Sequence, residues 1–150
     1  MPHINEKIDF TVEVFLVFNN KVLIRKHDKY DIFTGVGGHI EPDEDPVQAA
    51  IREVREETGL EITLIDYQQI SHEPGDLIPP YAINRHRIND RHEHVGFFYC
   101  GKVKSDKVVQ IVEERSDDIS WLTKNEILQS DKLSNNIRTY ALKALELCSE

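Results

Sequence analysis

The sequence predicts an α+β fold in which a β-sheet lies between layers of helix. Two strands open the chain, residues 10–18 (FTVEVFLVF) and 21–25 (KVLIR), and a two-asparagine turn joins them as a hairpin. The near-continuous apolar run of the first strand indicates burial on both faces, as in a sheet that is covered on either side. Two later segments, 46–58 and 135–148, have helical periodicity.

The composition is that of one folded domain over residues 1–150. Hydrophobic residues make up 39% and charged residues 30%, which is too apolar for a disordered chain. The N-terminus lacks the order of a signal peptide and no apolar run could span a membrane, so we expect a cytoplasmic protein. Cys100 and Cys148 lack metal-ligand spacing and are expected to be buried or free thiols.

The net charge of −9 argues against binding to long nucleic acid, because affinity for a phosphate backbone comes from clustered lysine and arginine. A polyphosphate substrate would meet the same repulsion unless cations lie between protein carboxylates and substrate oxygens. The net negative charge of the protein is therefore compatible with a diphosphate substrate only if cations are cofactors.

The helix predicted over 46–58 has defined ends and one apolar face. Asp45 is expected to be the N-cap before Pro46, and Gly59 is expected to be a left-handed C-cap. The apolar face consists of Val47, Ala50, Ile51, Val54 and Thr58. The helix can therefore pack on a core along one side.

Three glutamates, Glu53, Glu56 and Glu57, lie beside that face in the last two turns. On a period of about 3.6 residues, Glu57 falls about 40° to one side of Glu53 and Glu56 about 60° to the other. Carboxylates this close to one another and to a helix C-terminus repel unless a cation lies among them, and Mg²⁺ suits oxygen ligands. The alternative is a solvated acidic face that Arg52 and Arg55 neutralise.

The residues from Gly38 to Leu60 have a spacing that resembles the signature of the Nudix hydrolases. Gly38 is followed after five residues by Glu44, and after seven more by REVREETGL at 52–60, so that every specified position matches. The resemblance implies a Nudix fold, with a mixed β-sheet sandwiched between α-helices. It also implies hydrolysis of a diphosphate linkage in a nucleoside diphosphate derivative.

The expected function is that of a Mg²⁺-dependent pyrophosphohydrolase, with Mn²⁺ as a substitute cation. The expected substrate is a nucleotide, a standard or oxidised nucleoside triphosphate that is released as monophosphate and pyrophosphate. One alternative is an ADP-sugar or dinucleoside polyphosphate hydrolase, although Pro74 and Tyr81 are not in the register that marks those subfamilies. Another is a non-catalytic module that senses a nucleotide, but such modules typically lack the signature carboxylates that this chain keeps. A homodimer is left open.

The resemblance also assigns roles to individual residues. The expected metal ligands are the backbone carbonyl of Gly37 and the side chains of Glu53, Glu56 and Glu57. The expected structural supports are Gly38, Glu44, which orients the loop or a metal-bound water, and Arg52, which braces Glu56.

The catalytic set implied by the resemblance is Glu53, Glu56, Glu57 and Glu114. In relatives, a glutamate a few residues before a tryptophan often reaches the metal site from a loop, and Glu113 and Glu114 occupy that region. Glu53 and Glu114 are both candidates for the general base, and the sequence does not choose between them.

After the helix, the sequence predicts a strand over 61–70 and a long irregular loop over 71–91. The end of this loop concentrates cationic and histidine side chains in an otherwise acidic chain: Arg85, His86, Arg87, Arg91, His92 and His94.

Two interpretations of this basic cluster stay open. In the first, Arg85, Arg87, Arg91 and His92 bind the phosphates of the substrate, and Tyr81 stacks on its base. In the second, the loop is solvated and its charges pair with Asp90, Glu93 and other carboxylates. The histidines also admit a zinc site, but they alternate along an extended strand and the sequence offers no obvious fourth ligand.

The remaining elements are predicted to be structural. A strand is expected over 94–103 and a short one over 108–112. Thr123 and Glu126 form a capping-box pattern that opens a short helix. The final helix, 135–148, is amphipathic and is expected only to pack.

Overall fold

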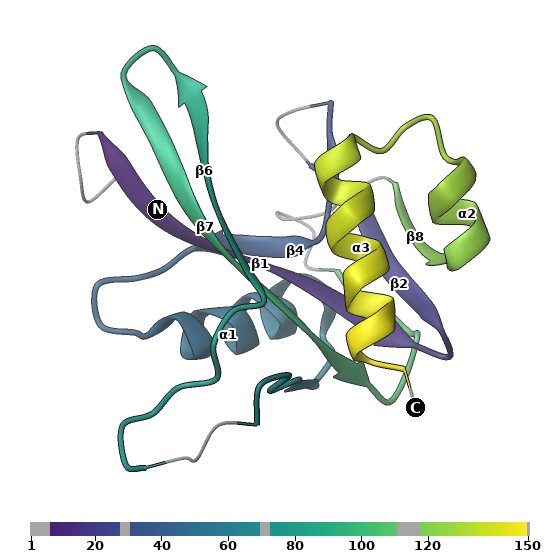
Figure 1. Ribbon diagram of the computed structural model, residues 1–150, viewed down its shortest axis with the longest axis horizontal. Helices are drawn as coiled ribbons and strands as arrows, with labels where there is room; N and C mark the ends of the chain where they lie inside the picture. The colour runs from purple at the N-terminus through teal and green to yellow at the C-terminus, as the bar shows by residue number, and fades with distance from the viewer. Residues whose placement is uncertain (1–6, 28–30, 70–72, 111–117, 150) are drawn as a thin grey trace.

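The computed structural model describes residues 7–27, 31–69, 73–110 and 118–149. Within these residues, eight strands form one sheet with the order β3-β2-β1-β7-β5, while β4 pairs with β1, β6 with β7 and β8 with β2. The strands are β1 Ile8–Phe18, β2 Lys21–Lys26, β3 Phe33–Thr34, β4 Val36–His39, β5 Ile62–Leu64, β6 Ala82–Asn89, β7 His92–Val103 and β8 Ile119–Thr123. The helices are α1 Pro46–Thr58, α2 Lys124–Gln129 and α3 Asn135–Leu147 (Figure 1).

The central strand β1 makes the sheet mixed. It pairs in parallel with β7 along nearly its whole length, and antiparallel with both β4 and β2. The turn from β1 to β2 is the predicted one, with Asn19 and Asn20 both at positive φ, 47° and 59°. Such angles match the twist of a two-residue hairpin.

The two faces of β1 support separate cores, as its apolar run predicted. Val12, Val14 and Leu16 belong to one cluster with the buried face of α1. Phe15 and Val17 belong to a second cluster with α3. The sheet therefore lies between α1 on one side and α3, accompanied by α2, on the other (Figure 1).

Helix α1 begins and ends where the sequence predicted. Asp45 caps it and forms a capping box with Gln48, and Gly59 adopts φ 72° while its N–H donates to the Arg55 carbonyl. The face predicted to be apolar is buried or partly buried, with Ala49 added to it. The glutamates thus lie on a helix that is fixed at both ends.

The second helix layer also follows the prediction. Thr123 and Glu126 form the capping box of α2, and Ser134 caps α3. Cys100 on β7 and Cys148 at the end of α3 are both buried and both free thiols, which confirms the expectation for the cysteines.

Three predicted segments differ from the structure. The strand expected over 61–70 is only the short β5, and residues 108–110 are not in a strand, while 111 and 112 lie outside the described residues. The loop expected over 71–91 contains the strand β6, which pairs with β7 as a hairpin. β6 lacks an apolar run because it has no further partner among the described strands and most of its residues are exposed, so the local sequence does not reveal it.

No helix within the described ranges is both long and apolar enough to cross a membrane.

Replacing Gly37 with alanine is expected to lower the free energy of unfolding by about 2 to 3 kcal/mol, the cost of overpacking against backbone that cannot move aside. A Cβ at Gly37 would lie 2.0 Å from the carbonyl oxygen of Val12 in the paired strand β1. Urea unfolding measures the effect. Gly96→Ala is the control, because its Cβ would meet only side-chain atoms and none closer than 3.3 Å, namely Phe98 ring carbons and the hydroxyl oxygen of Thr11. A loss no larger than that of the control would contradict the prediction.

Candidate active site

Two of the three glutamates meet the glycine segment of β4. Glu57 accepts a hydrogen bond through Oε2 from the N–H of Gly37, at 3.3 Å. A Cβ at Gly38 would lie 2.3 Å from Oε1 of Glu53, so only glycine leaves room for that carboxylate. Helix α1 therefore places Glu53 and Glu57 against consecutive residues of one strand.

Two arginines hold the carboxylates. Nη1 of Arg52 lies 2.9 Å from Oε1 of Glu53 and 3.2 Å from Oε2 of Glu56. Nη2 of Arg25, on β2, lies 3.1 Å from Oε2 of Glu57. The side chains of Glu53 and Glu57 are almost buried, whereas that of Glu56 is 43% exposed. The acidic patch thus has one face toward solvent.

Arg52 also fixes the loop before the helix. It donates through Nε and Nη2 to the two carboxylate oxygens of Glu44, at 3.0 and 2.5 Å, and through Nη2 to the carbonyl of His39. Glu44 in turn accepts from the N–H of Glu41. The side-chain hydrogen bond from Arg52 lowers the pKa of Glu44, and the same bond raises the pKa of Arg52. Both groups are therefore charged at neutral pH.

The donor set around the patch consists of oxygen atoms, which suits a hard divalent cation. The carboxylates of Glu53 and Glu56 lie against Arg52, and that of Glu57 lies against Arg25 and the amide of Gly37. Among the described residues, the group of three ligating side chains with donor atoms within 4.8 Å of one another is a different one, Asp9, His92 and His94. Glu113 and Glu114, including the second candidate base, lie outside the described residues.

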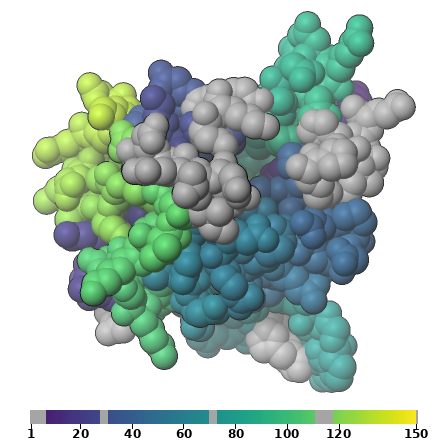
Figure 2. Space-filling view, turned by 180° about the vertical axis from the view of Figure 1, so that it is seen from behind, coloured from purple at the N-terminus to yellow at the C-terminus, as the bar shows by residue number. Residues whose placement is uncertain are grey.

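The basic residues predicted to bind substrate lie on the hairpin of β6 and β7. Arg85 forms an ion pair with Glu93, and Arg87 with Asp90 at 2.5 Å, which are the partners named in the solvated interpretation. The hairpin extends beyond the helices in Figure 1, and Figure 2 shows it in teal, projecting past the upper edge of the molecule. Arg91, near its tip, is exposed.

His92 and Tyr81, which were also predicted to bind substrate, make contacts within the protein. His92 is only 6% exposed and lies beside Asp9. Tyr81 packs against the α3 core, and its hydroxyl donates to the carbonyl of Tyr140 at 2.9 Å, which ties β6 to α3. Burial also raises the pKa of Tyr81.

A cavity of about 280 Å³ lies between the sheet and α3. Its lining includes the aromatic rings of Phe33, Phe98 and Tyr140 and the polar side chains of Glu13 and Asn84. Glu13 accepts from the N–H of Gly35 at 2.9 Å, just before the segment that contacts Glu53 and Glu57. The cavity and the acidic patch therefore adjoin the same stretch of chain, on either side of it.

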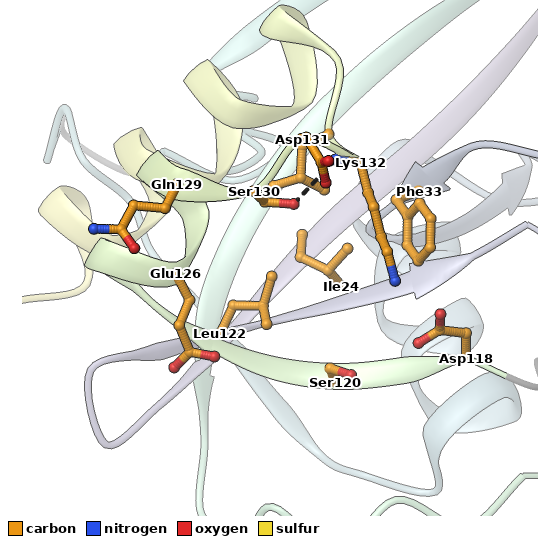
Figure 3. Close-up of a pocket in the computed structure, with 11 residues that line it drawn as sticks. Ile24, Phe33, Asp118, Ser120, Leu122, Glu126, Gln129, Ser130, Asp131 and Lys132 are labelled. Carbon is orange, nitrogen blue, oxygen red and sulfur yellow. Dashed lines mark hydrogen bonds between the residues drawn. The ribbon is translucent and has the colours of Figure 1, made fainter.

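A second cavity, of about 330 Å³, lies beside the first and shares Phe33 and Lys132 with it. Figure 3 shows it between β8, Ile24 of β2 and the connection from α2 to α3, with Lys132 extending alongside the ring of Phe33. The Lys132 amine lies 5.7 Å from the centre of that ring. Among the residues that the structure describes, none of those predicted to be catalytic or to bind metal lines this second cavity.

Sequence reasoning raised a zinc site among the histidines but missed the partners that Asp9 and His39 supply near the N-terminal end of β1. There the carboxylate of Asp9 lies among the rings of His39, His92 and His94, which come from β4 and β7. Burial, together with the neighbouring imidazoles, lowers the pKa of His94 to about 4. Two histidines separated by one residue on a predicted strand must share a face, which was the available signal.

Comparisons with known proteins identify the family of the chain. A family model described as the NUDIX domain matches residues 8–143. The CTP pyrophosphohydrolase of Escherichia coli (strain K12) is 32% identical over 78 residues, which are 49% of this chain and 58% of that protein. The matched stretch thus spans little more than half of that relative.

Solved structures extend the similarity to the whole fold. A hydrolase of the NUDIX family from Clostridium perfringens has a TM-score of 0.80 and 31% identity, covering 96% of this chain and 99% of that one. A MutT NUDIX hydrolase from Burkholderia pseudomallei, with a TM-score of 0.66 and 17% identity over 95% of this chain and 98% of that one, shares the fold. The predicted mixed sheet between helices is confirmed, and the chain belongs to the NUDIX family of hydrolases.

Proposed function

We propose that this protein is a Mg²⁺-dependent pyrophosphohydrolase that cleaves a diphosphate linkage in a nucleotide. The observation that carries the proposal is the meeting of Glu53 and Glu57 with the backbone of Gly37 and Gly38, with Glu56 beside them on the solvent side. This arrangement offers several oxygen ligands at the edge of a rigid helix. The similarity to a CTP pyrophosphohydrolase supports a nucleoside triphosphate as substrate and a monophosphate and pyrophosphate as products.

Glu53, Glu56, Glu57 and the carbonyl of Gly37 would hold the cation, which is Mg²⁺ with Mn²⁺ as a substitute. When bound, it supplies charge that offsets the phosphate oxygens in the transition state and lowers the pKa of a bound water. Arg25 and Arg52 form ion pairs with the patch, which offset part of its negative charge and orient the carboxylates.

The protein residues would also handle the proton of the attacking water. A carboxylate oxygen of Glu53 or of Glu114 accepts this proton as the water oxygen attacks phosphorus and the bond to the leaving phosphate breaks. Arg52, whose Nη1 lies 2.9 Å from Oε1 of Glu53, would orient that carboxylate. Both residues stay candidates for the base.

The cavity beneath α3 suits the nucleoside part of such a substrate. Its aromatic rings could stack on a base, and Glu13 and Asn84 could hydrogen-bond to the edge of the base. Binding of phosphates by Arg85, Arg87, Arg91 and His92, and stacking by Tyr81, stay predictions. So do the cytoplasmic location and a homodimer.

The other functions are less well supported. A module that only senses a nucleotide would not need all of the signature carboxylates, and this chain has them. Hydrolysis of an ADP-sugar or of a dinucleoside polyphosphate uses the same cation site, so the choice depends on the substrate assay described below.

Replacing Glu56 with glutamine is expected to lower kcat by about 100-fold or more, the effect of removing one stabilising group from a charged transition state. Release of pyrophosphate and phosphate is measured across a magnesium titration. Glu61→Gln is the matched control, because Glu61 follows the helix and pairs with Arg55 on the exposed surface. Equal activity of the two variants would contradict the catalytic role, and nucleotide binding without any release in the wild type would favour a sensor.

A substrate panel is expected to give the highest kcat/KM with a nucleoside triphosphate, with CTP included because of the similar pyrophosphohydrolase. The panel contains standard and oxidised nucleoside triphosphates, ADP-sugars and dinucleoside polyphosphates. The products should be the monophosphate and pyrophosphate. Preference for an ADP-sugar or a dinucleoside polyphosphate, or release of single phosphate from a triphosphate, would overturn the substrate assignment.

Replacing Glu13 with glutamine is expected to change how stability depends on pH. Burial raises the pKa of Glu13 from 4.5 to about 7, against the lowering by the Gly35 N–H and Arg25. As pH rises from 4.5 to about 7, the unfolded chain loses this proton first, so the carboxyl makes stability fall by up to about 1.4 kcal/mol per pH unit.

Glu13→Gln should remove that fall, and urea unfolding at about pH 5 and about pH 8 measures it. Glu61→Gln serves as the control, since the Arg55 hydrogen bond lowers the pKa of Glu61. If the Glu13 variant shows the same difference in stability between the two pH values as the wild type, the raised pKa of Glu13 is contradicted.

A further inference from the structure

The register of the sheet gathers Asp9 and several histidines on one face, which also carries His86 of β6, the direct partner of His94. Asp9 of β1 is the direct partner of His94 in the parallel pairing with β7, and His92 lies two residues before His94. On the other side of β1, His39 of β4 is the partner of Thr11, two residues from Asp9. Side chains at such positions project from the same face of a sheet.

The ligating atoms of these side chains lie close to the spacing of ligands around an ion. Nε2 of His92 lies 3.3 Å from Oδ2 of Asp9, and Nε2 of His39 lies 3.7 Å from the same oxygen. Ligand atoms of Asp9, His92 and His94 all lie within 4.8 Å of one another. Bonds of about 2.0 to 2.1 Å in a tetrahedral zinc site place ligand atoms about 3.3 Å apart, so shifts of about 1 Å would close the site.

The orientation of the rings also fits ligands that converge. The ring of His94 lies 5.0 Å from those of His39 and His92, at 83° and 88° to them. They are thus nearly perpendicular to it and not stacked. Each imidazole can therefore approach a shared centre along its own direction.

The burial of this group sets it apart from a surface cluster. Asp9 is 2% exposed and His92 6%, in a layer where a strand ordinarily places apolar side chains. Buried carboxylates require a cationic or hydrogen-bonding partner, and a metal ion is one that several imidazoles can share.

We propose that Asp9, His92 and His94, with His39 as the fourth ligand, form a site for a zinc-like transition-metal ion. Three nitrogen ligands and one carboxylate suit Zn²⁺, whereas the all-oxygen patch on α1 suits Mg²⁺. The two sites share no ligand. The ion would join β1, β4 and β7 at their common end and would fix His39, whose carbonyl accepts from Arg52.

The site does not depend on the proposed hydrolysis, so its test uses metal binding by the full chain without a histidine tag. Wild type is dialysed against Zn²⁺ in excess Mg²⁺, which occupies oxygen ligands, and bound zinc is measured together with the thermal midpoint. We expect one zinc per chain and a raised midpoint. His94→Ala and His94→Gln should each weaken zinc binding by at least about 100-fold, since even loss of an outer-shell partner costs 10- to 100-fold.

Two control variants should keep the zinc. His27→Ala removes a histidine outside the cluster, and Glu56→Gln removes a carboxylate of the α1 patch. The glutamine variant of His94 preserves the shape of the side chain, so a folded variant without zinc separates a lost ligand from a lost fold. The proposal is overturned if wild type retains no zinc, if the His94 variants retain it, or if Glu56→Gln loses it.

Discussion

The contact between the carboxylates of α1 and the glycine segment of β4 is the constraint on which the candidate site depends. Glu57 accepts from the Gly37 amide, and the space above Gly38 is filled by the carboxylate of Glu53. The helix can approach this closely because β4 has no side chains there. Capping at Asp45 and Gly59 then fixes which turn of the helix faces the strand. A local requirement for glycine thus determines where the acidic patch lies in the molecule.

The arginines explain how such a patch persists in a chain that is already acidic. Arg52 forms ion pairs with Glu44, Glu53 and Glu56. Arg25, which belongs to strand β2 of the sheet, forms an ion pair that offsets the charge of Glu57. Carboxylates held in ion pairs are oriented in advance, which reduces the reorganisation needed when a cation binds. The second cluster, around Asp9, uses imidazoles in place of guanidinium groups, and so has a different preference for metals.

Much of the fold could be predicted because its signals are local. The asparagine turn, the ends of α1 and the capping box of α2 each depend on a few neighbouring residues. β6 was missed because its residues are mostly polar and exposed, and only its pairing with β7 makes it a strand. The glutamates were found from their spacing on one helix, whereas Asp9 and His39 could not be joined to His94 without knowing the sheet register.

The parallel pairing of β1 with β7 also has a consequence for biogenesis. β1 is a central, largely apolar strand, and the strand that pairs along nearly its whole length, β7, is far away in the sequence. A ribosome therefore releases β1 well before its partner, and the exposed edge must wait through the synthesis of α1 and β6. Contacts of this range slow the search for the native topology and favour transient self-association of nascent chains.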